Sequence, residues 1–118
     1  MNIFIEYPKC TTCKKAKKFL DEHKIVYIDR NIKIDKPTYD ELKKYYMTSH
    51  LDINKLFNTS GLVYKELGLK EKLPNMSVEE KLQILSSDGM LVKRPIFVSN
   101  NKTYFGFKEA EWEKIKED

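Results

Sequence analysis

Cysteine and histidine are scarce in this chain. Its 118 residues include two cysteines, Cys10 and Cys13, and two histidines, His23 and His50. A structural zinc site needs four ligands, and these two histidines do not stand at zinc-finger spacing from the cysteine pair. The sequence therefore predicts no metal site, and the cysteines must be explained in another way.

Long apolar runs are absent as well. No apolar run exceeds about five residues, whereas a membrane-spanning helix needs about 20. The chain enters a predicted strand directly, with no signal-peptide core. We therefore expect a cytoplasmic protein without a membrane partner, in a compartment where a stable structural disulfide is rare.

Arginine is the rarest of the basic residues. Of 22 basic residues only Arg30 and Arg94 are arginines, and 18 acidic residues leave a net charge of +4. Because arginine binds two oxygens of an oxyanion at once, the chain has few groups suited to such a site. The small charge excess and the lack of a basic groove motif argue against direct binding of nucleic acid through the lysines.

The composition, 41% hydrophobic and 34% charged, suits one domain with a modest core. Apolar patterns predict strands at 3–6, 26–30, 96–98 and 103–107. Capping boxes at Thr38-x-x-Glu41 and Ser77-x-x-Glu80 indicate two helix starts. Further helical segments are predicted at 11–23, 52–58, 62–67 and 109–116. This order gives an α/β sheet with helices on its faces.

Helical spacing also predicts which side chains face inward. Ala16, Phe19, Leu20 and His23 share one face of the first helix. A later helix carries the stripe Val78, Leu82 and Leu85, and the last helix turns Trp112 and Ile115 inward.

The most informative segment is a short strand, a turn and a Cys-x-x-Cys pair that opens a helix. The positive end of a helix favours a thiolate, which is the reactive form of cysteine. In a cytosolic protein, this arrangement indicates a thioredoxin-like redox motif. Cys10 is predicted as the nucleophile, and Cys13, one turn further in, as the resolving cysteine. The alternative is a pair of unreactive structural cysteines.

The lysines around the cysteine pair and the single residue Arg94 each allow two interpretations. The lysines at positions 9, 14, 15, 17 and 18 form either a solvated helix face or a field that attracts anions and acidic partners. Arg94 either pairs with an acidic surface residue or serves the cysteine site. The sequence leaves the isomer of Pro95 open.

Four segments together resemble a known family. They are Tyr7–Ala16, Lys55–Gly61, Asp88–Ile96 and Gly106–Glu109. In them the chain is similar to the arsenate reductase (ArsC)/Spx/MgsR family of thioredoxin-fold proteins, in its arsenate reductase-like branch. The resemblance extends over essentially the whole chain.

The resemblance implies a thioredoxin-like fold, in which a mixed sheet is flanked by helices. A helical insertion, about residues 34–88, would lie between the second and third strands of a single domain spanning 1–118. It also implies that Arg94 lies beside the nucleophile Cys10, ahead of a cis Pro95. We expect substrate to be bound by Thr11, Thr12, Asn58 and Pro95.

We therefore expect a cytoplasmic thiol–disulfide oxidoreductase that acts on a small oxyanion or a disulfide. No cofactor would be bound, and thioredoxin or glutathione with glutaredoxin would be the external reductant. Asn58 stands where arsenate-reducing members carry an arginine, which disfavours arsenate turnover by the glutathione route. The alternative is an Spx-like, redox-switched transcriptional regulator that binds the α subunit of RNA polymerase.

Overall fold

The computed structural model describes residues 1–117, and the side chains of residues 1–115. Four strands form one sheet in the order β2-β1-β3-β4. Strand β1 runs parallel to β2 and antiparallel to β3, which is antiparallel to β4. The strands are β1 (Asn2–Glu6), β2 (Ile28–Asn31), β3 (Ile96–Ser99) and β4 (Lys102–Phe105). The expected mixed sheet is confirmed.

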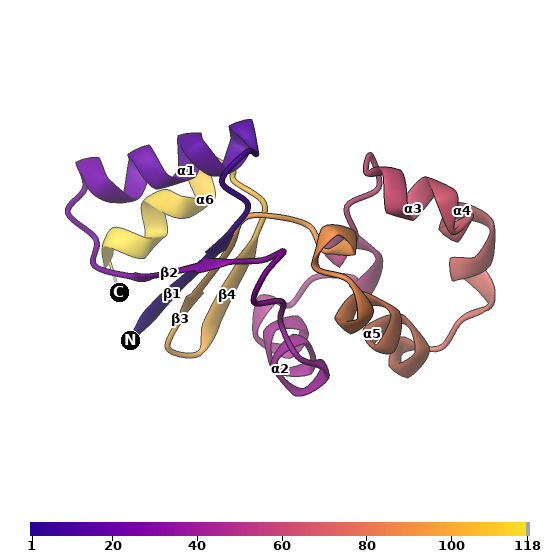
Figure 1. The fold of residues 1–118 in the computed structure, drawn as a ribbon. Helices are drawn as coiled ribbons and strands as arrows, with labels where there is room; N and C mark the ends of the chain where they lie inside the picture. Colours follow the sequence, from indigo (N-terminus) through magenta and orange to yellow (C-terminus); the bar gives the residue numbers. More distant parts are fainter. Residues whose placement is uncertain (118) are drawn as a thin grey trace.

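Two helices cover one face of this sheet (Figure 1). They are α1 (Thr11–Glu22) and α6 (Glu109–Trp112), which a 3-10 segment, η4 (Glu113–Glu117), continues. Apolar residues at helical spacing in α1 meet Phe4 and Phe97 of the sheet and the fully buried Trp112. This packing fixes the start of α1, and so the cysteine pair, above the end of β1.

The helical insertion begins beside the other face of the sheet and extends away from it (Figure 1). Its α-helices are α2 (Tyr39–Ser49), α3 (Leu62–Glu66), α4 (Leu69–Lys72) and α5 (Val78–Ser87). The 3-10 turns between them are η1 (Ile53–Leu56), η2 (Leu73–Asn75) and η3 (Gly89–Leu91). All of these lie between β2 and β3 in the sequence, as the resemblance implies.

Alternation along the strands explains how one sheet supports both layers. Phe4 faces the α1 and α6 layer, whereas its neighbour Ile5 packs into the cluster formed with the insertion. That second cluster joins Ile96 of the sheet to Leu42 of α2 and Leu82 of α5. The insertion therefore shares its core with the sheet.

Both predicted capping boxes are present. Thr38 accepts from the backbone N–H of Glu41, whose carboxylate accepts in return from the N–H of Thr38. Ser77 and Glu80 form the same pair at the start of α5. At the end of the insertion Gly89 lies against the carbonyl of Ile32, where a Cβ atom would collide with that oxygen. A glycine there lets the insertion close onto the end of β2.

Several sequence expectations are wrong in detail. The second strand begins at Ile28 and not at Val26, whose side chain is 83% exposed. His23 is exposed at the end of α1, although its ring contacts that of Phe19. Val78 is 42% exposed, although it shares the helix face of Leu82 and Leu85, because it is the first residue of α5.

The C-terminal elements also differ from the prediction. Strand β4 ends at Phe105, because Gly106 has a φ of 76° that turns the chain out of the extended conformation. The predicted last helix is α-helical only to Trp112 and then 3-10. Trp112 and Ile115 are nevertheless buried, as predicted. Helix α4 and turn η2 were not predicted.

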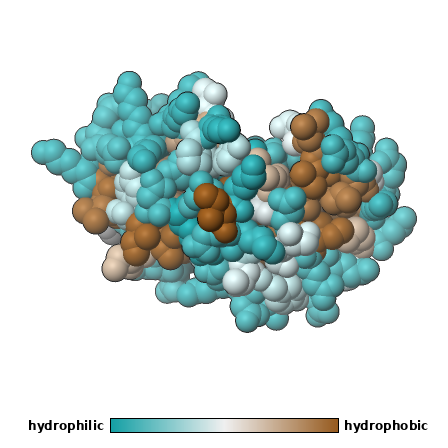
Figure 2. Space-filling model, in the orientation of Figure 1, coloured by the Kyte–Doolittle hydropathy of each residue, from teal (hydrophilic) through white to brown (hydrophobic). Residues whose placement is uncertain are grey.

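The surface in this orientation is mostly hydrophilic, with separate hydrophobic patches (Figure 2). None of the helices among the described residues combines the length and the hydropathy that crossing a bilayer requires.

Candidate functional site

Cys10 caps the N-terminus of α1. Its backbone N–H donates to the carbonyl of Tyr7 at 2.9 Å, which closes the turn after β1. Its Sγ accepts from the backbone N–H of Cys13 at 3.3 Å. The residue is only partly buried, so part of its surface is open to solvent. A sulfur that accepts a backbone N–H at a helix start is well placed to carry negative charge.

Cys13 lies in the opposite environment. It is fully buried, and burial raises the pKa of its thiol to about 12. A hydrogen bond with Cys10 and the nearby charges of Cys10 and Glu6 act in the same direction. Cys13 therefore remains a protonated thiol next to the more exposed Cys10, and the two cysteines are chemically distinct.

Beneath the pair lies a buried carboxyl that the sequence reasoning missed. Glu6, the last residue of β1, is 4% exposed. Burial, followed by a hydrogen bond and charge repulsion from Asp29, raises its pKa to about 7. Lys17 partly opposes the shift, with its Nζ 3.8 Å from Glu6 and 2.8 Å from Asp29. The available signal was an acidic residue at the end of an apolar strand.

Arg94 faces the turn that holds Cys10. Its guanidinium carbon lies 5.4 Å from the centre of the Tyr7 ring, a cation–π contact. One terminal nitrogen donates to the carbonyl of Met90 at 3.4 Å. The Nε is buried, and among the described residues nothing accepts from it. The peptide bond to Pro95 is cis, as the resemblance implies.

The alternative for Arg94, an ion pair with an acidic residue, is not found among the described residues. Arg94 instead donates a hydrogen bond to one carbonyl and lies over one aromatic ring, and its Nε has no acceptor among the described residues.

Asn58 approaches Arg94 from the insertion. Its side-chain amide donates to the same Met90 carbonyl, also at 3.4 Å, and Ser60 donates to its side-chain oxygen. The backbone is fixed by a 2.8 Å hydrogen bond from the Asn58 N–H to the carbonyl of Leu91. The structure therefore brings Asn58 and Arg94 together around one carbonyl oxygen.

Thr11 and Thr12 are exposed in the first turn of α1. This position leaves them available to a ligand. Two of the lysines of α1 have carboxylates nearby: Lys17 pairs with Asp29 and Glu6, and Lys18 lies 4.0 Å from Glu22. Within the described part of the chain, no three metal-ligating side chains gather together.

Comparison with known proteins gives a consistent set of relatives. A model of the ArsC family matches residues 5–115. The uncharacterised protein YusI of Bacillus subtilis (strain 168) is 51% identical over 110 residues, covering 93% of each chain. The regulatory protein MgsR of the same strain is 33% identical over 112 residues, covering 95% of this chain and 87% of MgsR. The global transcriptional regulator Spx of Staphylococcus aureus (strain COL) is 30% identical over 104 residues, covering 88% and 78%.

Solved structures agree with the fold. An ArsC family related protein from Bacteroides fragilis has a TM-score of 0.95 and 50% identity, covering 97% of this chain and 96% of its own. A possible arsenate reductase from Streptococcus mutans UA159 has a TM-score of 0.88 and 40% identity, covering 96% and 98%. These likenesses confirm the thioredoxin-like fold with its helical insertion.

Proposed function

The chain belongs to the ArsC family, and on that premise we propose that it is a thiol–disulfide oxidoreductase. The observation that carries the proposal is the difference between the two cysteines. Cys10 is accessible and accepts a backbone N–H, whereas Cys13 is buried with a pKa of about 12. We assign the cycle to the cytoplasm, where cellular reductants keep thiols reduced.

Cys10 begins the reaction as a thiolate. It attacks one sulfur of a substrate disulfide, forms a mixed disulfide with that sulfur and releases the other as a thiolate. Cys13 then gives up its proton and attacks the Cys10 sulfur. This forms the Cys10–Cys13 disulfide and releases the second substrate thiolate. The substrate gains two electrons, and the cysteine pair loses them.

An external dithiol restores the enzyme. Thioredoxin attacks the Cys10–Cys13 disulfide, leaves oxidised and returns both cysteines to the reduced state. Because Cys13 resolves the intermediate internally, this route needs no glutathione. Glutathione with glutaredoxin is the competing reductant.

The substrate side of the site suits a group with partial negative charge. Arg94 holds a delocalised positive charge over Tyr7, and its Nε still has a hydrogen to donate. Asn58 and the first turn of α1 supply neutral hydrogen-bond donors. Neither binds two oxygens of an anion at once, as a second arginine would. A disulfide that develops thiolate charge therefore fits better than fully charged arsenate.

Coupled turnover tests this proposal. Oxidation of NADPH would be followed with the thioredoxin system and, separately, with the glutathione/glutaredoxin system. Each assay would contain either a disulfide substrate or arsenate, with Cys10→Ser protein as the blank. We expect disulfide turnover above the blank with thioredoxin as the better reductant. Turnover equal to the blank with every combination would overturn the proposal.

The likeness to MgsR and Spx supports a second candidate function. In this case the pair is a redox switch without turnover, and the protein binds the α subunit of RNA polymerase in one redox state. Oxidation would join Cys10 and Cys13 and so change the turn between β1 and α1.

Binding to purified RNA polymerase α subunit distinguishes the two candidates. A regulator would bind the subunit in one redox state at least tenfold more tightly than in the other. Equal or undetectable binding in both states, together with disulfide turnover, would eliminate the regulatory candidate.

A further inference from the structure

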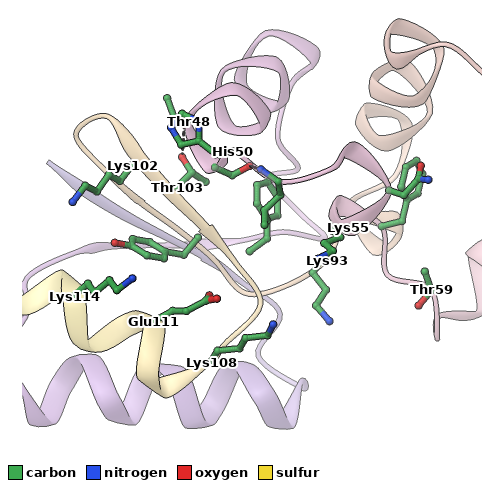
Figure 3. Close-up of a pocket in the computed structure, with 16 residues that line it drawn as sticks. Thr48, His50, Lys55, Thr59, Lys93, Lys102, Thr103, Lys108, Glu111 and Lys114 are labelled. Atoms are coloured by element: carbon green, nitrogen blue, oxygen red, sulfur yellow. Dashed lines mark hydrogen bonds between the residues drawn. The ribbon is translucent and has the colours of Figure 1, made fainter.

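A basic cleft lies beside the edge strand β4. It has a volume of about 710 Å³ and is bounded by the end of α2, by η1, by β4 and by α6 (Figure 3). Five lysines line it, and among the described lining residues Glu111 is the one carboxylate. The lysines are Lys55, Lys93, Lys102, Lys108 and Lys114.

The lining of this cleft has an excess of positive charge as large as that of the whole chain. Five lysines and one glutamate give the lining a formal charge of +4, which equals the net charge of the chain. The rest of the sequence therefore contains as many acidic as basic residues. Like charges gathered in a concave surface repel one another and raise the local concentration of anions.

The described structure leaves most of this charge without a counterion. Lys55, Lys93, Lys108 and Lys114 have no carboxylate of a described residue within 4.0 Å. Lys17, outside the cleft, shows the contrasting case, because two carboxylates lie within that distance. An anionic ligand in the cleft would therefore meet lysines that it can neutralise.

Lys93, which lines the cleft, is the sequence neighbour of Arg94, which belongs to the cysteine site. Arg94 turns toward Tyr7, whereas the side chain of its neighbour Lys93 crosses Gly106 on the cleft side. A Cβ atom on Gly106 would lie 2.9 Å from Cε of Lys93, so the lysine side chain passes close to the backbone at this turn. A molecule seated in the cleft would thus contact the neighbour of Arg94, whose guanidinium lies over the ring of Tyr7 in the turn before Cys10.

The type of basic side chain in the cleft indicates the type of anionic ligand that it suits. All five are lysines, which act as point charges and lack the planar fork by which arginine grips phosphate. They project from separate elements along the cleft (Figure 3), which suits several carboxylates spaced along a chain. Thr48, Asn54 and Thr59 add hydrogen-bonding groups, and the partly exposed Tyr104 and Phe105 add apolar surface.

We infer that this cleft docks an acidic polypeptide segment of the protein whose disulfide reacts at Cys10. The inference rests on the proposed oxidoreductase function and gives it a substrate class, namely proteins with an acidic stretch near the reactive disulfide.

Peptide binding tests the docking site without any redox step. The probe is a fluorescein-labelled decapeptide of alternating glutamate and serine, titrated with the reduced full-length protein. The cleft variant is Lys55→Glu with Lys108→Glu. The matched control is Lys65→Glu with Lys70→Glu, which makes the same charge change at exposed positions of α3 and α4.

We expect the Kd to rise more than tenfold in the cleft variant and less than twofold in the control. No binding of the peptide by the wild-type protein, or equal losses in the two variants, would overturn the inference. Tighter binding of a single-stranded oligonucleotide than of the peptide would also overturn it.

Kinetics then separate this inference from the proposed function. The wild-type protein and both variants would reduce neutral 2-hydroxyethyl disulfide and a peptide disulfide flanked by glutamates. We expect the ratio of kcat/KM for the acidic over the neutral disulfide to fall at least fivefold in the cleft variant only. An unchanged ratio contradicts docking, whereas failure of the wild-type protein on both disulfides contradicts the oxidoreductase function.

Discussion

At the scale of single residues, the difference in burial between the two thiols assigns them different roles. Cys10 is accessible at the cap of α1, and Cys13 is fully buried one turn later. Because a thiolate is the nucleophile and burial raises the pKa of the Cys13 thiol, the more exposed Cys10 reacts first.

Alkylation measures this division directly. With iodoacetamide at pH 7.5, we expect Cys10 to be modified at least tenfold faster than Cys13, because burial raises the pKa of Cys13 to about 12. Peptide mass spectrometry over a time course gives both rates, and urea-unfolded protein is the control in which the rates converge. Faster modification of Cys13 in the folded protein would reverse the assigned roles.

Glu6 links folding to pH. Burial raises its pKa from 4.5 to about 7, so the folded state binds the proton more tightly than the unfolded state. The stabilisation is complete below about pH 4.5 and is lost as the pH rises through 7. Glu6→Gln cannot ionise, so we expect it to be more stable than the wild type at pH 8 by on the order of 2 kcal/mol. At pH 5 the difference should be small.

Urea unfolding at pH 5 and pH 8 checks this expectation. Glu66→Gln is the control, because it makes the same change at an exposed position of α3. A Glu6→Gln variant that is less stable than the wild type at pH 8 would show that the Lys17 contact outweighs the burial of the carboxylate.

The sequence predicted the residues whose roles depend on local spacing. The cysteine pair could be found because a three-residue separation at a helix start is a local pattern. Glu6 was missed because its burial depends on α1 folding over the end of β1 and on Asp29 lying beside it. Neither contact is visible in the sequence around Glu6.

At the scale of elements, reciprocal capping fixes where the insertion helices begin. The Thr38–Glu41 box starts α2, and Glu41 also receives two hydrogen bonds, of 2.8 and 3.0 Å, from Arg30 in β2. Hydrogen bonding with Arg30 lowers the pKa of Glu41 to about 2. One carboxylate therefore both caps α2 and ties it to the sheet.

Removing the cap should destabilise the protein measurably. We expect Thr38→Ala to lower the free energy of unfolding by about 1 kcal/mol, because the Glu41 N–H loses its acceptor. Chemical denaturation measures the change. Thr38→Ser keeps the hydroxyl and should lose less than half as much, whereas equal losses would indicate that the Thr38 methyl group is responsible.

Element boundaries followed local signals only in part. The capping boxes were predicted because their chemistry lies within a few residues. The 3-10 segment after α6 was not, because Trp112 and Ile115 face inward in either kind of helix. Apolar spacing alone does not separate the two.

At the scale of the whole molecule, the insertion and the sheet share one core. Leu82 of α5 and Leu42 of α2 belong to the same cluster as Ile5 and Ile96. The second cluster, around Trp112, lies on the opposite face of the same sheet. We therefore expect residues 1–118 to unfold as one cooperative unit.

The single tryptophan makes this expectation testable. Leu82→Ala should lower the free energy of unfolding by about 2–5 kcal/mol. It should also shift the midpoints of Trp112 fluorescence and far-UV circular dichroism together. Leu62→Ala, at a side chain that is 76% exposed, is the matched control with little effect. A circular dichroism transition that precedes the fluorescence transition would mean that the insertion unfolds separately.

Assembly also explains why the basic cleft could not be predicted. Its lysines lie at positions 55, 93, 102, 108 and 114, on elements that come together only in the folded chain. In the sequence these lysines are interspersed with acidic residues. The net charge of +4 does not show where basic side chains gather in the fold. The lysines of α1, which the sequence made conspicuous, include two with carboxylates nearby.

Trapping the covalent intermediate tests the central claim, that Cys10 attacks and Cys13 resolves. A disulfide substrate would be mixed with the wild-type protein, with Cys10→Ser and with Cys13→Ser, and each reaction would be quenched. Intact-protein mass spectrometry would then measure the mass of each product. We predict that Cys13→Ser accumulates a mixed disulfide on Cys10, that Cys10→Ser accumulates none, and that the wild type ends as the Cys10–Cys13 disulfide. An adduct on Cys10→Ser with none on Cys13→Ser would contradict the account.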